Sequence, residues 1–85
     1  MVLHEMIPYG IIFMVMNMYF QRLRDVRQDA EQTQQSIADM LNVQRSVYRR
    51  YELGEREIPV GLLIKLAQYY GVSTDYLLGL TERRQ

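Results

Sequence analysis

The chain has 85 residues, of which 48% are hydrophobic and 24% are charged, and its ten basic residues balance ten acidic ones. A chain of this length forms one small domain with a thin hydrophobic core. The absence of cysteine excludes disulfides and zinc–thiolate sites and is compatible with a reducing compartment, so we expect a cytoplasmic protein. A net charge of zero gives no indication of a polyanionic partner, so only the distribution of charge can reveal one.

Residues 1–18 differ in composition from the rest of the chain. The apolar run from Tyr9 to Phe20 is shorter than the roughly 20 residues that a membrane-spanning helix needs. The segment also lacks the basic start and small-residue cleavage site of a secretory signal. It is therefore interpreted as an apolar extension, and the sequence leaves open a strand, an oligomer contact or a mis-annotated start.

A first helix is predicted from roughly Tyr19 to Gln28, because Phe20, Leu23 and Val26 recur at three-residue steps between polar residues. The helical pattern fades in the polar stretch that follows, residues 29–32.

The second predicted helix begins after Thr33, whose hydroxyl can accept a hydrogen bond from a free backbone N–H. Ile37, Ala38 and Leu41 form its apolar stripe. Asn42 follows, and asparagine tolerates the positive φ of a tight turn better than any residue except glycine. A helix, a short turn and another helix are therefore expected here.

The third predicted helix starts near Gln44 and stops at Gly54. At about 100° per residue it has two distinct faces. One face carries polar and cationic residues, namely Arg45, Ser46, Arg49 and Arg50. The opposite face carries apolar residues, namely Val47, Tyr48 and Tyr51.

Two further helices are predicted, one opened by Pro59 and closed by Gly71, and one capped by Ser73 and closed at Gly79. Five short helices joined by tight turns define an all-α domain, a compact five-helix bundle. The short turn between the second and third helices predicts a helix-turn-helix with the second of the two exposed.

The cationic face of the third helix suits a DNA major groove, which admits one α-helix. Arginine matches the two acceptors of guanine, glutamine matches adenine, and serine serves either base. The candidate DNA-binding residues are Gln44, Arg45, Ser46, Arg49 and Arg50. A solvated charged face is the alternative, but no acidic residue lies four positions away within this face, although Glu52 lies on its border.

Residues outside this face have predicted supporting roles. Gln34, at the start of the second helix, is placed to contact a phosphate and to brace Gln44. Arg27 and Glu52 could form an ion pair between the first and third helices, or could remain two separate solvated charges. Tyr48 lies on the apolar face, which favours core packing over base stacking.

Residues 22–81 resemble the phage-repressor and Cro-like helix-turn-helix regulators, the XRE family. The resemblance is carried by "TQQSIA" at 33–38, "RRYELGER" at 49–56, "LIKLAQYYGVS" at 63–73 and "TDYLLGLT" at 74–81. It implies a lambda-repressor-like DNA-binding domain over residues 19–81, followed by a tail at 82–85.

The resemblance also implies roles for individual residues. Gln34 and Gln44 would occupy positions that contact phosphate or brace a neighbouring side chain. The base-reading residues would be Arg45, Ser46 and Arg50. Arg49 would lie close to bases or to the DNA backbone. Arg27 and Glu52 would form the ion pair that links the first and third helices.

The resulting functional prediction is a sequence-specific transcription regulator, a repressor that binds double-stranded DNA with a palindromic site as a homodimer. The alternative is an antitoxin or another regulator whose main partner is a protein, such as a toxin. No nucleophile–base set, carboxylate pair or metal cluster is present in the sequence, so neither an enzyme nor a cofactor is expected.

Overall fold

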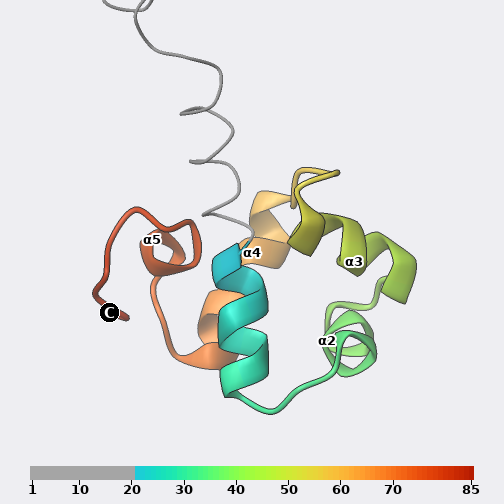
Figure 1. Cartoon of the computed structure of the whole chain (residues 1–85), viewed down its shortest axis with the longest axis horizontal. Helices are drawn as coiled ribbons and strands as arrows, with labels where there is room; N and C mark the ends of the chain where they lie inside the picture. The colour runs from blue at the N-terminus through green and yellow to red at the C-terminus, as the bar shows by residue number, and fades with distance from the viewer. Residues whose placement is uncertain (1–20) are drawn as a thin grey trace, which may run out of the picture.

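The computed structural model describes residues 21–85, and every regular element in this range is a helix (Figure 1). A first described helix occupies residues 21–29, and it is followed by α2 (Gln34–Leu41), α3 (Arg45–Leu53), α4 (Val60–Tyr70) and α5 (Thr74–Leu77). The predicted all-α fold class is confirmed. The predicted extension at residues 1–18 and the predicted helix start at Tyr19 lie outside the described residues.

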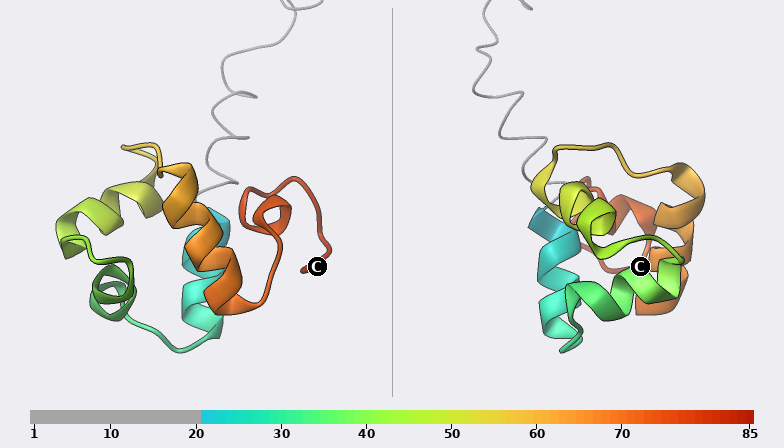
Figure 2. Two further views of the ribbon diagram at one scale, coloured as in Figure 1. Left: turned by 180° about the vertical axis from the view of Figure 1, so that it is seen from behind. Right: turned by 90° about the vertical axis from the view of Figure 1, so that its right-hand side faces the viewer.

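The first described helix lies between two groups of elements. Figure 1 shows α2 and α3 on one side of it and α5 on the other, and the view from behind in Figure 2 agrees. In Figure 1 α2 is seen nearly end-on while α3 runs across the view, so the two helices cross steeply. This is the arrangement expected of a helix-turn-helix.

The core is assembled from all of these helices. Leu23 and Val26 of the first described helix are buried, as predicted from their spacing. The most deeply buried side chains of the other elements are Ile37, Ala38, Tyr48, Leu66 and Leu77, each 0% exposed. Complete burial of one large apolar side chain stabilises a fold by about 1.5–3 kcal/mol, so this small set holds α2 and α3 in fixed relative positions.

Local chemistry fixes both ends of α2. The hydroxyl of Thr33 accepts a hydrogen bond from the Ser36 backbone N–H at 3.0 Å, and the Ser36 hydroxyl accepts one from the Thr33 N–H at 3.1 Å. At the other end Asn42 adopts φ 60° and ψ 44°, in the left-handed region. Both predicted boundaries are confirmed.

Three boundaries differ from the sequence prediction. The first described helix ends at residue 29, and Glu31 in the turn that follows has φ 56°, a left-handed conformation that the sequence did not indicate. Pro59 is the residue before α4, one position earlier than predicted. The last helix ends at Leu77, with Leu78 as its right-handed cap, before the predicted stop at Gly79.

The C-terminal tail, residues 82–85, packs on the turn between α4 and α5. The Ser73 N–H donates to the carbonyl of Arg84 at 2.6 Å, and the amide of Gln85 donates to the carbonyl of Gly71 at 2.9 Å. On the other side of α5, the guanidinium of Arg22 lies 4.1 Å from the centre of the Tyr76 ring. These contacts attach α5 to the rest of the domain.

Candidate nucleic-acid interface

The two faces predicted for α3 are present in the structure. Tyr48 and Tyr51 are buried, 0% and 3% exposed, and their rings meet edge to face with centroids 6.4 Å apart. The candidate base-reading residues are all exposed on the same helix: Arg45, Ser46, Arg49 and Arg50. The tyrosines therefore anchor α3 to the core, and because they are buried they are not accessible for stacking on bases.

The start of α3 carries Gln44. This residue precedes the helix in an extended conformation, its side chain makes no capping hydrogen bond, and it is exposed. A helix N-terminus presents unpaired backbone N–H groups and a partial positive charge, both of which favour an anion. The amide of Gln44 is therefore exposed beside the first turn of α3.

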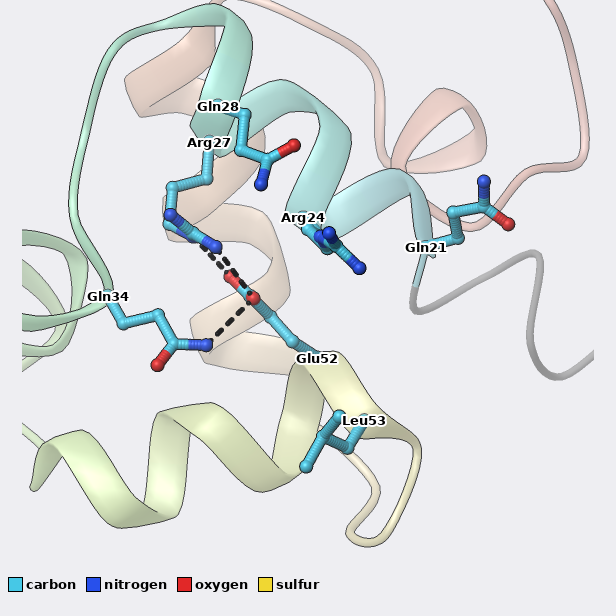
Figure 3. Close-up of a pocket in the computed structure, with 7 residues that line it drawn as sticks. All are labelled: Gln21, Arg24, Arg27, Gln28, Gln34, Glu52 and Leu53. Atoms are coloured by element: carbon cyan, nitrogen blue, oxygen red, sulfur yellow. Dashed lines mark hydrogen bonds and ion pairs between the residues drawn. The ribbon is translucent and has the colours of Figure 1, made fainter.

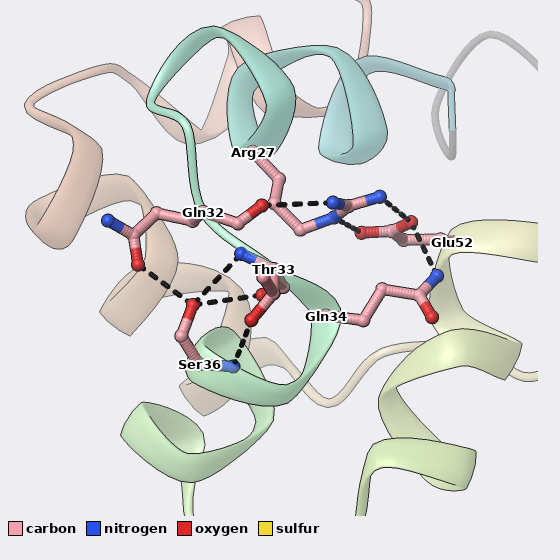
Figure 4. A network of polar contacts seen from close by, with 6 residues as sticks. All are labelled: Arg27, Gln32, Thr33, Gln34, Ser36 and Glu52. Atoms are coloured by element: carbon pink, nitrogen blue, oxygen red, sulfur yellow. Dashed lines mark hydrogen bonds and ion pairs between the residues drawn. The ribbon is translucent and has the colours of Figure 1, made fainter.

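The structure places Gln34 differently from its predicted bracing role. Its Nε2 donates to Glu52 Oε1 at 3.1 Å (Figure 4), whereas the sequence suggested that it would brace Gln44. Gln34 is half-buried and lies at the first position of α2. The Gln34 amide therefore joins α2 to the end of α3.

Arg27 and Glu52 form a bidentate ion pair between the first described helix and α3. Arg27 Nε lies 2.6 Å from Glu52 Oε2, and Arg27 Nη2 lies 3.1 Å from Glu52 Oε1. Arg27 Nη1 also donates to the backbone carbonyl of Gln32 at 3.0 Å. The side chains are only 12% and 3% exposed, so this pair is part of the interior and not a surface contact.

The environment of Glu52 contains opposing influences on its pKa. Burial alone would raise it, but the hydrogen bonds from Arg27 and Gln34, together with the nearby Tyr48 hydroxyl, hold the pKa of Glu52 below its usual range. Desolvation and the neighbouring Glu52 raise the pKa of Tyr48 above its usual range. Glu52 is therefore ionised and Tyr48 is neutral at neutral pH.

The ion pair forms the floor of a cavity of about 600 Å³. Figure 3 shows Glu52 between Arg27 and Gln34, with Arg24 and Gln28 on the side of the first described helix. Arg24 and Gln28 were not identified from the sequence, because their proximity to Gln34 depends on how the first described helix packs against α2. Five of the seven residues that line the cavity are glutamine or arginine, whose side chains donate hydrogen bonds.

The two acidic residues that the sequence placed nearest to the exposed face of α3, Glu52 and Asp39, have partners outside that face. Glu52, which bordered this face in the sequence, turns inward to Arg27. Asp39 on the surface of α2 accepts a hydrogen bond from the Gln35 amide at 2.8 Å. The charges of Arg45, Arg49 and Arg50 are therefore not compensated by an ion pair with any residue in the range 21–85.

Residues 21–85 contain neither a metal-binding cluster nor a helix that could span a membrane. They contain no group of three or more His, Cys, Asp or Glu side chains able to hold a metal ion. None of the helices in the same range is both long and apolar enough to cross a membrane.

Comparison with known proteins identifies the family. Residues 23–77 match the family described as "Helix-turn-helix". The uncharacterized HTH-type transcriptional regulator YobD of Bacillus subtilis is 40% identical over 65 residues, which are 76% of this chain and 58% of YobD. The HTH-type transcriptional regulator ImmR of the same organism is 42% identical over 62 residues, 73% of this chain and 49% of ImmR.

A more distant relative comes from another bacterium. The cryptic phage CTXphi transcriptional repressor RstR of Vibrio cholerae is 29% identical over 65 residues, 76% of this chain and 59% of RstR. The chain spans about half the length of the curated relatives it matches. No solved structure gives a significant match.

Proposed function

The chain belongs to the XRE family of helix-turn-helix transcriptional regulators, and on this premise we propose that it binds DNA through the exposed face of α3. The observation that carries the proposal is the division of α3 into buried tyrosines and exposed arginines. A helix anchored on one side and cationic on the other can enter a major groove without rearrangement of the core.

The proposed roles of the exposed residues follow from their chemistry and position. Arg45, Ser46 and Arg50 would contact base edges, and Arg49 would lie close to bases or to the backbone. Gln44 would bind a phosphate at the start of α3. Gln34 can still donate one amide hydrogen to a phosphate, because its hydrogen bond to Glu52 occupies only one of the two.

We further propose that the protein is a cytoplasmic repressor that acts as a homodimer on a palindromic operator. Two copies of α3 would enter successive major grooves about 34–36 Å apart, which doubles the number of contacts available to one small domain. The relative RstR is named a transcriptional repressor, which supports this direction of regulation.

Selection of binding sites from a random DNA pool tests the proposal directly. The wild-type chain should enrich one sequence with inverted symmetry. Arg50→Ala should weaken binding to that sequence by about 1–3 kcal/mol and relax the preference at one base position of each half-site. Lys65→Ala is the control, since Lys65 is an exposed cation on α4 and not on the α3 face.

Two outcomes would contradict the proposal. One is an Arg50→Ala variant that keeps wild-type affinity and base preference. The other is the failure of the wild type to enrich any sequence, which would instead favour a regulator whose main partner is a protein.

A further inference from the structure

A cleft of about 420 Å³ lies where three segments of the chain meet. The first described helix and the turn after it supply Val26, Asp29 and Ala30. The end of α4 supplies two tyrosines, and the C-terminal tail supplies Arg84. Figures 1 and 2 show the tail on the opposite side of the first described helix from α2 and α3. The cleft is therefore separate from the α3 face, and its volume is within the usual range for small-molecule sites, about 300–1,000 Å³.

Contacts of the C-terminal tail fix the position of Arg84. Its backbone carbonyl accepts a hydrogen bond from the Ser73 N–H at 2.6 Å. Its Nη1 donates to the Tyr76 hydroxyl at 3.3 Å, and its guanidinium carbon lies 5.1 Å from the centre of the Tyr76 ring. A guanidinium has five N–H donors, and this hydrogen bond to the hydroxyl uses one of them. The guanidinium can therefore still bind a carboxylate from a ligand.

Asp29 places a negative charge in the same cleft. It is the last residue of the first described helix, where the partial negative charge of the helix C-terminus disfavours another negative charge. Neither Asp29 nor Arg84 belongs to an ion pair among residues 21–85. The cleft thus contains one anion and one cation that are not neutralised by each other or by a neighbour in the described part of the chain.

The remaining lining is apolar and aromatic. Val26 and Ala30 contribute aliphatic surface. The rings of Tyr69 and Tyr70 meet edge to face, with their centroids 5.2 Å apart. Tyr69 is 48% exposed, whereas the Tyr70 hydroxyl is buried and has no hydrogen-bond partner among the described residues. Tyr70 therefore contributes its ring to the cleft and not its hydroxyl.

A small zwitterion with an apolar side chain matches these features. Its ammonium would bind Asp29 and its carboxylate would bind Arg84, both through charge-assisted hydrogen bonds. The aromatic rings would contact the apolar side chain, and an ammonium is also attracted to the face of such a ring. A simple anion would be repelled by Asp29, and a simple cation would be repelled by Arg84. An α-amino acid carries both charges on one carbon atom, next to its side chain.

We propose that this cleft binds a free α-amino acid with an apolar side chain. The proposal does not depend on the proposed DNA-binding function, because no residue of α3 lines the cleft. Most of the lining residues are exposed, so the ligand remains partly in water. A dissociation constant on the order of 0.1–1 mM is therefore expected.

The test is a titration of the isotopically labelled 85-residue chain, followed by two-dimensional NMR of its backbone amides. Three probes of similar size separate the two charges: L-phenylalanine, phenylpropanoate, which lacks the ammonium, and phenethylamine, which lacks the carboxylate. Asp29→Asn and Arg84→Gln each remove one charge from the cleft. The matched controls are Asp25→Asn and Arg83→Gln, which change exposed residues that do not line the cleft.

The proposal predicts a specific pattern of affinities. In the wild type, phenylalanine should shift the amide signals of residues 26–30, 69–70 and 84, and each singly charged probe should bind about tenfold more weakly. Asp29→Asn should bind phenylalanine about tenfold more weakly and should no longer distinguish it from phenylpropanoate. Arg84→Gln should likewise no longer distinguish phenylalanine from phenethylamine. Both control variants should behave like the wild type.

Three results would overturn the proposal. The first is the absence of shifts around the cleft at about 10 mM phenylalanine, roughly ten times the weakest dissociation constant expected. The second is equal affinity of the wild type for phenylalanine and phenylpropanoate, which would indicate a site for anions alone. The third is unchanged discrimination among the probes by Asp29→Asn and Arg84→Gln. The comparison of probes in the wild type does not require any variant to fold.

Discussion

Removal of the Glu52 charge is the most informative perturbation of the fold. In Glu52→Gln the side chain keeps its shape, but its new amide hydrogens face Arg27 or Gln34, both of which are donors. Loss of one partner from a buried ion pair costs about 3–5 kcal/mol. Because Arg27 is 12% exposed and can regain some water, we expect the free energy of unfolding to decrease by about 3 kcal/mol, near the lower end of this range.

Such a loss is large for a chain of this size. Natural domains are stable by about 0.05–0.15 kcal/mol per residue, which gives about 4–13 kcal/mol for 85 residues. A loss of about 3 kcal/mol should lower the melting temperature by roughly 12–24 °C. Urea denaturation at pH 7, followed by far-UV circular dichroism, measures the free energy of unfolding.

A double-mutant cycle separates the pair from its surroundings. Arg27→Met should cost more than Glu52→Gln, because it leaves a carboxylate that is only 3% exposed. The combination Arg27→Met with Glu52→Leu should be less destabilising than the sum of its single changes. Glu57→Gln, at an exposed position, should change the free energy of unfolding by less than about 0.5 kcal/mol. Single changes below about 1 kcal/mol each, with no coupling, would refute a structural role for the pair.

Three further predictions concern titration and backbone conformation. The depressed pKa of Glu52 contributes stability that is present above the unfolded pKa of about 4.3 and is lost as the pH falls through the folded pKa. The urea midpoint of the wild type should therefore decrease as the pH is lowered below about 5, and that of Glu52→Gln should decrease less steeply; equal slopes would contradict this. Glu31→Gly should raise the free energy of unfolding by about 1 kcal/mol, because φ 56° strains a glutamate but not a glycine, and an unchanged urea midpoint would contradict this. Gly61→Ala should raise it by up to about 1 kcal/mol, because a Cβ there meets no atom within 4 Å; a lowered melting temperature would oppose this reasoning.

The fold could be predicted from sequence wherever a local rule decides the conformation. Thr33 and Asn42 mark the ends of α2 because their side chains favour those backbone conformations by themselves. The burial of Tyr48 and Tyr51 followed from helical spacing alone. Glu31 could not be predicted, because glutamate has no intrinsic preference for positive φ. The turn that contains it is closed by hydrogen bonds from the Gln32 N–H to the Arg27 carbonyl and from Arg27 Nη1 to the Gln32 carbonyl.

The candidate site was less accessible to sequence reasoning, because it depends on how separate helices meet. The spacing of Arg45, Arg49 and Arg50 predicted a cationic face, and a single helix is sufficient for that prediction. The hydrogen bond from Gln34 to Glu52 joins residues 18 positions apart on two helices. The sequence suggested Gln44 as the partner and gave no indication of Glu52.

The inward position of Glu52 also explains how a chain without net charge presents a cationic surface. An acidic residue on the outer face of α3 would cancel one of its arginines and would repel DNA. In the interior it is neutralised by Arg27, and its charge instead fixes Gln34 at the start of α2. This ion pair therefore removes a negative charge from the α3 face, joins the first described helix to α3, and holds in place the Gln34 amide for which we propose a phosphate contact. Loss of Glu52 should consequently weaken DNA binding even under conditions in which the domain remains folded.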